Sequence, residues 1–242
     1  MGFGWRQHIP KNENWPEAKD FFNQILSASI INEWTTLKMS IDQYKNGRFP
    51  IIKICRGNHL LPWLVKQFDF KFKPIYMVRH PMAIVSSQIK QGGWNSEYSK
   101  FSMPTMPFNE VYLRHEAFLS GLKTKGESLL ATWCITHRAL LKHKNTSWIP
   151  VFYEELMLDP ETHFNDIFSE WELPVPSKLF NRFNLWSSTS LNTSQSINRE
   201  NQLIKWKNEF SEDELKGFQI ILDYFDISTY TVYDPMPKHK II

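Results

Sequence analysis

Three short apolar runs, rich in β-branched and aromatic residues, are bounded by turn or breaker residues along the chain. They cover residues 49–55 (FPIIKIC), 74–79 (PIYMVR) and 148–153 (WIPVFY). Runs of this length and composition predict buried β-strands.

Segments in which apolar residues recur with helical spacing lie between and after these strands, at residues 60–68, 81–90, 128–141, 160–171 and 212–225. Residues 17–31, ahead of the first strand, are also expected to form a helix. Local chemistry marks the start of two of them: Ser211 and Glu214 form a capping-box pattern, and Asp159 precedes a proline at the first helical position. Alternation of strands and helices favours the α/β class, with a parallel sheet and helical crossovers.

Two stretches lack this patterning. Residues 92–107 (GGWNSEYSKFSMPTMP) and 186–202 (WSSTSLNTSQSINRENQ) are rich in Ser, Asn, Gly or Pro. Such stretches predict long surface loops, which are either binding loops or ordinary irregular surface.

The chain has 242 residues, 42% of them hydrophobic, which is enough for a substantial core, and we expect a single domain over residues 1–242. The net charge of +3 argues against nucleic-acid binding and is compatible with an anionic small-molecule ligand. Cys55 and Cys134 lie within a predicted strand and a predicted helix, without metal-ligand spacing, which favours a reducing compartment. No run is long enough to span a bilayer, so the expectation is a cytoplasmic protein.

The segment with the clearest candidate chemistry is residues 73–90 (KPIYMVRHPMAIVSSQIK). Arg79 ends a predicted strand, Pro81 starts the next helix, and Ser87 follows about two turns later. Ligands gather at the carboxyl edge of open α/β sheets, where a guanidinium and a hydroxyl can converge on one phosphate. Equally, Arg79 could pair with a core acid while Ser87 caps a helix or faces solvent.

This segment resembles the 3′-phosphate-binding motif of sulfotransferases that use 3′-phosphoadenosine 5′-phosphosulfate (PAPS). In that motif a strand ends in Arg, x-Pro follows, and a Ser stands eight residues after the Arg, as Arg79, Pro81 and Ser87 do here. The Arg-His-Pro variant and the following QGGW are similar to bacterial members of the family.

Three further segments extend the resemblance in the family's order. Residues 53–64 (KICRGNHLLPWL) are similar to a family strand that ends in Lys and is followed by Leu-Leu-Pro. Residues 151–156 (VFYEEL) resemble a strand ending in Tyr-Glu-x-Leu. Arg199 precedes Trp206 by the interval of the family's C-terminal motif, although the glycine of that motif is replaced by the pair at 200–201.

The resemblance implies a P-loop-NTPase-like parallel sheet with flanking helices, and transfer of a sulfonate from PAPS to a hydroxyl or amine without a metal. Arg79, Ser87 and Arg199 would grip the 3′-phosphate, Tyr153 would lie near the adenine, and Lys53 would approach the sulfonate. The acceptor would be a small molecule or a carbohydrate.

The catalytic base is less clearly indicated. Cys55 occupies the position of the family's base histidine and is expected to be a buried strand residue. His59, four residues later, is the first candidate for the base; the alternative is a helix-start histidine that faces solvent.

The family's 5′-phosphosulfate loop, a Gly-Thr-Thr-Trp type turn after a strand, does not occur before residue 49. Residues 121–128 (GLKTKGES) have P-loop-like glycine spacing, but Glu127 stands where a phosphate-binding lysine is needed, so we expect only a turn before a helix. The expectation is an N-terminally incomplete domain that lacks its first strand and loop. An upstream segment or an oligomer would then complete the sheet.

Three hypotheses follow: a sulfotransferase, a catalytically inactive relative that retains only nucleotide or partner binding, and another nucleotide-dependent transferase such as a small-molecule kinase. The sequence has no Walker lysine and no evident Mg²⁺-ligand aspartate, which argues against the kinase.

Overall fold

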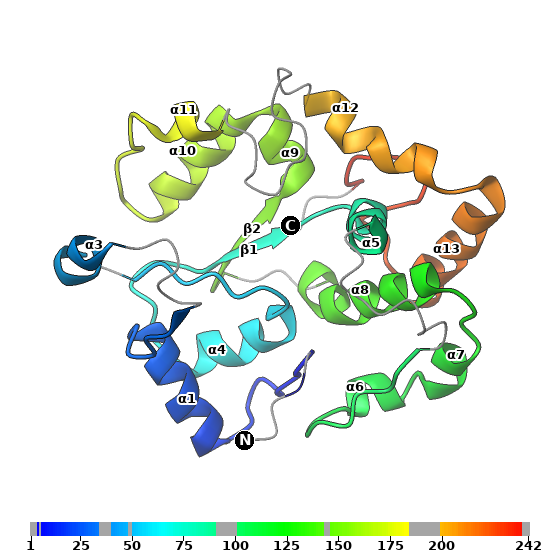
Figure 1. Ribbon diagram of the computed structural model, residues 1–242, viewed down its shortest axis with the longest axis horizontal. Coiled ribbons are helices and arrows are strands. Elements are labelled where there is room, and N and C mark those ends of the chain that lie inside the picture. The colour runs from blue at the N-terminus through cyan, green and yellow to red at the C-terminus, as the bar shows by residue number, and fades with distance from the viewer. Residues whose placement is uncertain are drawn as a thin grey trace. The chain divides into compact units, whose positions relative to one another are not determined.

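The computed structural model describes residues 4, 6–33, 40–47, 50–90, 101–142, 146–183 and 199–238 (Figure 1). The chain divides into two compact units: unit 1 comprises Met1–Asp69 and Pro104–Asn109, and unit 2 comprises Phe70–Met103 and Glu110–Ile242. The single domain expected from the length stays a prediction.

Unit 1 is helical in its described part. Its elements are α1 (Pro16–Leu26), α3 (Ile41–Asn46), the 3₁₀ turn η1 (Asn58–Leu60) and α4 (Leu61–Gln67).

The core of unit 1 forms around Trp63, which is fully buried. Phe22 meets the Trp63 ring edge-on with the ring centroids 5.8 Å apart, and the Trp63 indole N–H donates to the Glu13 carbonyl (2.9 Å). Helix α1 ends at Leu26, before the predicted end at residue 31, because Ala28 adopts a left-handed backbone conformation (φ 55°).

The strand predicted over residues 49–55 is wrong for the residues that are described. Residues 50–55 form no strand, the Ile51 side chain is 97% exposed, and Cys55 is exposed rather than buried. An apolar run becomes a strand only where a neighbouring strand accepts its backbone hydrogen bonds and a packed layer covers its side chains. The composition of this run indicates neither whether a neighbouring strand is present nor whether a layer covers the side chains.

The sheet of unit 2 consists of β1 (Ile75–Val78) and β2 (Ile149–Phe152) in the described ranges, and the two strands are parallel (Figure 1). Two of the three predicted strands are therefore confirmed. Within β1, Tyr76 and Val78 are buried while Met77 is 51% exposed, so the strand alternates between a packed and an open face. The sheet is parallel and has flanking helices, consistent with a general α/β class.

The main helices of unit 2 lie close to their predicted positions. Helix α5 spans the predicted residues Pro81–Lys90, and it packs on α8 (Lys125–Lys142), which in turn packs on α13 (Glu212–Tyr224). Helix α10 (Pro160–Glu170) packs on α9 (Tyr153–Leu158), and buried Ile167 joins Val151 and Leu156 in a local core. The remaining elements are α6 (Glu110–Leu113), α7 (Glu116–Ser120), α11 (Leu179–Phe183), α12 (Arg199–Ile204) and the 3₁₀ segment η2 (Lys205–Glu209).

Both predicted helix caps are confirmed. The Ser211 hydroxyl accepts the Glu214 N–H (3.3 Å), and the Glu214 carboxylate accepts the Ser211 N–H (2.8 Å), which completes the capping box. The Asp159 carboxylate accepts the Thr162 N–H (3.1 Å) ahead of α10.

The glycine-spaced run at 121–128 forms a turn and a helix start, as expected. The Glu127 carboxylate accepts the N–H groups of Lys123 (2.6 Å) and Thr124 (2.8 Å), and the Thr124 hydroxyl accepts the Glu127 N–H (3.1 Å). Because this reciprocal cap satisfies the first turn, α8 begins at Lys125, earlier than the predicted residue 128.

The two predicted loops are described only in part. Residues 92–100 of the first and 186–198 of the second lie outside the described residues, and residues 101–105 contain no helix or strand. The end of the second loop prediction is wrong, because α12 begins at Arg199. Burial of Leu203, directly after the polar stretch, anchors this short helix.

Candidate functional site

Arg79 and Tyr153 meet at the carboxyl edge of the parallel strand pair. Arg79 directly follows β1 and Tyr153 directly follows β2. The Arg79 guanidinium carbon lies 4.5 Å from the centroid of the Tyr153 ring, and both residues are half-buried. This is a cation–π contact, in which the electron-rich face of the ring attracts the positive charge.

Arg79 makes no ion pair within the described part of the chain, so the alternative that it pairs with a core acid has no support there. Its guanidinium donors therefore have no carboxylate partner among the described residues. A cation held against an aromatic face, with its donors not engaged by a carboxylate, is suited to bind an anion.

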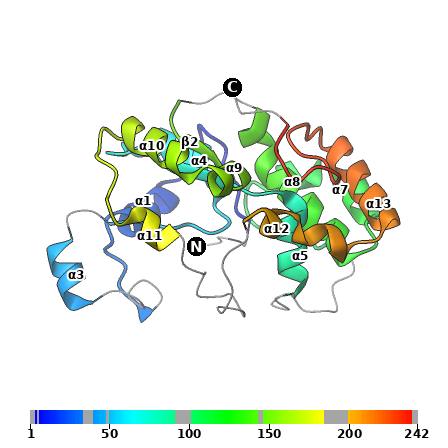
Figure 2. The same ribbon diagram turned by 90° about the horizontal axis from the view of Figure 1, so that it is seen from above.

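The other two predicted nucleotide-binding residues also belong to unit 2. Ser87 is half-buried on α5, the helix that leaves the end of β1. Arg199 begins α12, which packs against α9, the helix that begins at Tyr153; Figures 1 and 2 show these two helices side by side. Of these residues, Arg79 and Tyr153 are seen in direct contact.

The two predicted catalytic residues belong to unit 1. Lys53 is exposed in the stretch that forms no strand. His59 lies in η1 and is only 7% exposed, with its ring edge-on to His8 at 5.3 Å between centroids. The alternative that His59 faces solvent is therefore wrong.

A buried carboxylate that the sequence reading did not single out lies beside the Arg79–Tyr153 pair. Glu154, only 1% exposed, accepts the His80 backbone N–H through Oε1 (2.7 Å) and the Tyr230 hydroxyl through Oε2 (2.9 Å). Burial raises the pKa of Glu154, while the two hydrogen bonds and the Arg79 charge act in the opposite direction.

His80 is equally buried, and its side chain is fixed at both ring nitrogens. Nδ1 accepts the Met82 N–H (3.2 Å), so Nε2 carries the proton and donates to the carbonyls of Thr231 and Asp234, each at 3.0 Å. The ring stacks on Trp206, with the centroids 4.5 Å apart and the planes 13° from parallel. Burial lowers the pKa of His80 to about 4, so the imidazole is neutral at pH 7.

Sequence position offered one signal for this network. His80 and Glu154 each follow a predicted site residue at a strand end, and ionisable side chains at such positions are candidates for functional networks. Tyr230 carried no comparable signal, because its segment comes far later in the chain and joins the site only through tertiary packing.

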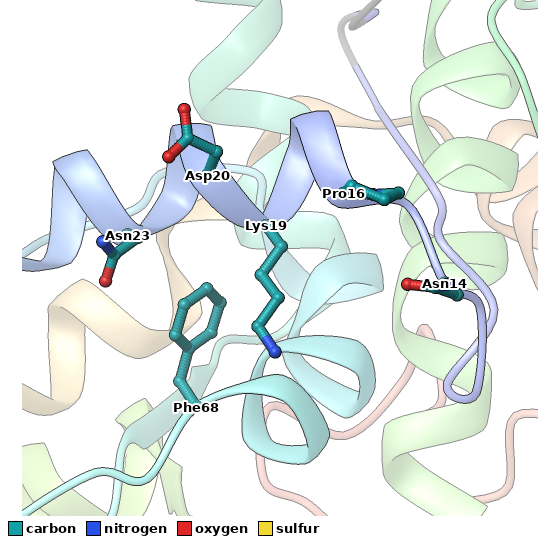
Figure 3. A pocket seen from close by; sticks show the side chains of 6 residues that line it. All are labelled: Asn14, Pro16, Lys19, Asp20, Asn23 and Phe68. Carbon is teal, nitrogen blue, oxygen red and sulfur yellow. The ribbon is translucent and has the colours of Figure 1, made fainter.

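A separate surface pocket of about 470 Å³ lies in unit 1 and contains none of the predicted site residues. In Figure 3 the Lys19 side chain runs from α1 past the ring of Phe68, while the Asp20 carboxylate points away from both. The lining residues are Asn14, Pro16, Lys19, Asp20, Asn23 and Phe68.

Within the part of the chain that the structure describes, no group of three or more His, Cys, Asp or Glu side chains is arranged to hold a metal ion. No helix in the same ranges has both the length and the apolar character needed to cross a membrane.

Comparisons with protein-family models, with curated proteins and with solved structures found no match to this chain.

Proposed function

We propose that this chain binds PAPS through its 3′-phosphate and is a sulfotransferase of the family that its sequence resembles. The observation that carries the proposal is the contact of Arg79 with Tyr153 at the carboxyl edge of two parallel strands. We also propose that the sheet has a P-loop-NTPase-like form and that Ser87 and Arg199 bind the same phosphate.

The charge and the shape of Arg79 both suit a phosphate. A guanidinium presents a planar fork of donors that matches the oxygens of a phosphate, and each charge-assisted hydrogen bond is worth about 1.5–3 kcal/mol. The Tyr153 ring holds the Arg79 guanidinium in one orientation, which lowers the conformational entropy lost on binding. The first turn of α5, directly beyond Arg79, adds the positive end of a helix dipole.

The chemistry proposed is an in-line transfer. An acceptor oxygen or nitrogen attacks the sulfur of PAPS, the bond from sulfur to the bridging phosphate oxygen breaks, and adenosine 3′,5′-bisphosphate leaves. A base takes the acceptor proton, and His59 stays the candidate for this step. Lys53 is the proposed cation at the sulfonate, and no metal is needed.

Calorimetric titration of the chain with adenosine 3′,5′-bisphosphate and with adenosine 5′-monophosphate tests the proposal. These ligands differ only in the 3′-phosphate, so tighter binding of the bisphosphate is expected. Equal affinities, or no binding of either, would refute it.

A second candidate is a protein that binds the nucleotide without transferring the sulfonate. It is favoured by the placement of the catalytic candidates, because Lys53 is exposed outside any strand and His59 is buried in a 3₁₀ turn of unit 1. An assay of adenosine 3′,5′-bisphosphate release from PAPS, with phenol, amine and sugar acceptors, separates the two. Acceptor-dependent release supports the transferase, and binding without release supports the second candidate.

A further inference from the structure

We infer that Glu154 is a positioning residue, which fixes the backbone directly after Arg79 and thereby orients the guanidinium toward a phosphate. This inference rests on the proposed function. It assigns a role to a side chain that does not itself touch the ligand.

The hydrogen bond from His80 to Glu154 acts directly beside Arg79 in the chain. The N–H that Glu154 accepts belongs to His80, so it is part of the peptide group that joins Arg79 to His80. Holding this peptide plane restricts the ψ angle of Arg79 and hence the direction in which its side chain leaves the backbone. The 2.7 Å bond to a buried carboxylate is a charge-assisted one, of the stronger kind in proteins.

Glu154 is itself held in place. Its other oxygen accepts the Tyr230 hydroxyl, and Tyr230 is fully buried. Both carboxylate oxygens therefore have protein partners, and a turn of the side chain toward a ligand would break these two hydrogen bonds. This arrangement suits a supporting role rather than direct contact with a nucleotide.

The segment carrying Tyr230 also holds the His80 side chain. The Thr231 and Asp234 carbonyls accept the His80 ring N–H. Residue 80 is thus anchored by its backbone through Glu154 and by its ring through the segment that follows Tyr230. The adjacent Arg79 is half-buried, and its guanidinium contacts the Tyr153 ring.

A negative charge beside a phosphate site opposes binding of an anion, because like charges repel over short distances. The presence of Glu154 beside the site therefore indicates that residue 154 acts by accepting hydrogen bonds and not through its charge. Glutamine keeps a carbonyl acceptor for the His80 N–H and has nearly the same shape. Glu154→Gln should therefore preserve the orientation of Arg79, whereas Glu154→Ala should not.

The test uses the ratio of two dissociation constants, that for adenosine 5′-monophosphate divided by that for adenosine 3′,5′-bisphosphate, measured with the whole chain. A purely structural role for Glu154 would lower thermal stability without changing this ratio. We expect Glu154→Ala to lower the ratio about tenfold, Glu154→Gln to keep it within about twofold, and Tyr230→Phe to lower it about threefold. Glu155→Ala, at the neighbouring half-buried glutamate, is the matched control and should leave the ratio unchanged.

The outcomes separate the two claims. A wild-type ratio near one overturns the proposed function, and this inference falls with it. A high wild-type ratio that persists in Glu154→Ala overturns the inference alone. If Glu154→Ala fails to fold, Tyr230→Phe decides, and an unchanged ratio in that variant rejects the positioning role.

Discussion

The guanidinium carbon of Arg79 lies 4.5 Å from the centre of the Tyr153 ring, although the two residues are far apart along the chain. They meet because Val78 of β1 and Phe152 of β2 are partners in the parallel register, so the next residue of each strand emerges at the same level of the sheet. The two strands thus deliver a cation and an aromatic ring to one edge. In parallel sheets, the residues that follow two paired strands generally lie close together at the carboxyl edge.

Replacing Tyr153 tests the importance of the ring. Tyr153→Leu removes the aromatic face below Arg79, and we expect adenosine 3′,5′-bisphosphate to bind about fivefold more weakly, the equivalent of about 1 kcal/mol for a half-buried cation–π contact. Tyr153→Phe keeps the face and should bind as the wild type does. Equal binding by the leucine variant, measured by calorimetry, would argue against a role for the ring.

The buried imidazole of His80 predicts a pH dependence of stability. Its pKa is lowered to about 4 in the folded chain, while an unfolded histidine titrates near 6.5. Between these values the unfolded state binds more protons, so the contribution of His80 is complete above pH 6.5 and is lost as the pH falls through 4. The free energy of unfolding should fall by about 3 kcal/mol from this source between pH 7 and pH 4.

The comparison that isolates this contribution is between the wild type and His80→Gln. The raised pKa of Glu154 acts oppositely, since it stabilises the fold at low pH and this contribution is lost as the pH rises through the raised value. Because Glu154 accepts the backbone N–H of residue 80, the substitution leaves that hydrogen bond in place. The contribution of Glu154 to the pH dependence therefore cancels between the wild type and the variant. Urea unfolding at several pH values should give a flatter profile for the variant; parallel profiles would contradict a buried, neutral His80.

The capping box of α13 predicts a local contribution to stability. Ser211→Ala removes the acceptor for the Glu214 N–H, and we expect a loss of about 1 kcal/mol in the free energy of unfolding. Ser120→Ala is a suitable control, because that exposed serine donates to the Glu116 carbonyl within a helix and caps no helix start. Thermal unfolding should show a lower midpoint for the Ser211 variant than for the control.

Local chemistry explains why several elements could be predicted from the sequence. Helix α5 begins at Pro81 and ends at Lys90 as predicted, because proline suits the first helical turn and the apolar spacing continues to the last. The two caps at Asp159 and Ser211 depend on residues three positions apart, so sequence spacing contains the whole interaction.

The features that the sequence did not reveal depend on distant partners. Residues 50–55 have strand composition, yet no neighbouring strand pairs with them in the described structure, so propensity alone gave a wrong result. The Glu154 network joins two strand ends to Tyr230 near the end of the chain. Only the fold brings these side chains together, and a single sequence has no pattern that marks them as partners.

Substitution of Arg79 tests most directly whether this residue binds the 3′-phosphate of a nucleotide. The measurement is the affinity of Arg79→Ala for adenosine 3′,5′-bisphosphate and adenosine 5′-monophosphate. The control for loss of charge is Arg114→Ala, at an exposed arginine directly after α6. Removal of a charge-assisted phosphate contact worth about 1.5–3 kcal/mol predicts bisphosphate binding about 10- to 150-fold weaker, with monophosphate binding unchanged. Bisphosphate affinity equal to that of the wild type in Arg79→Ala would contradict the account.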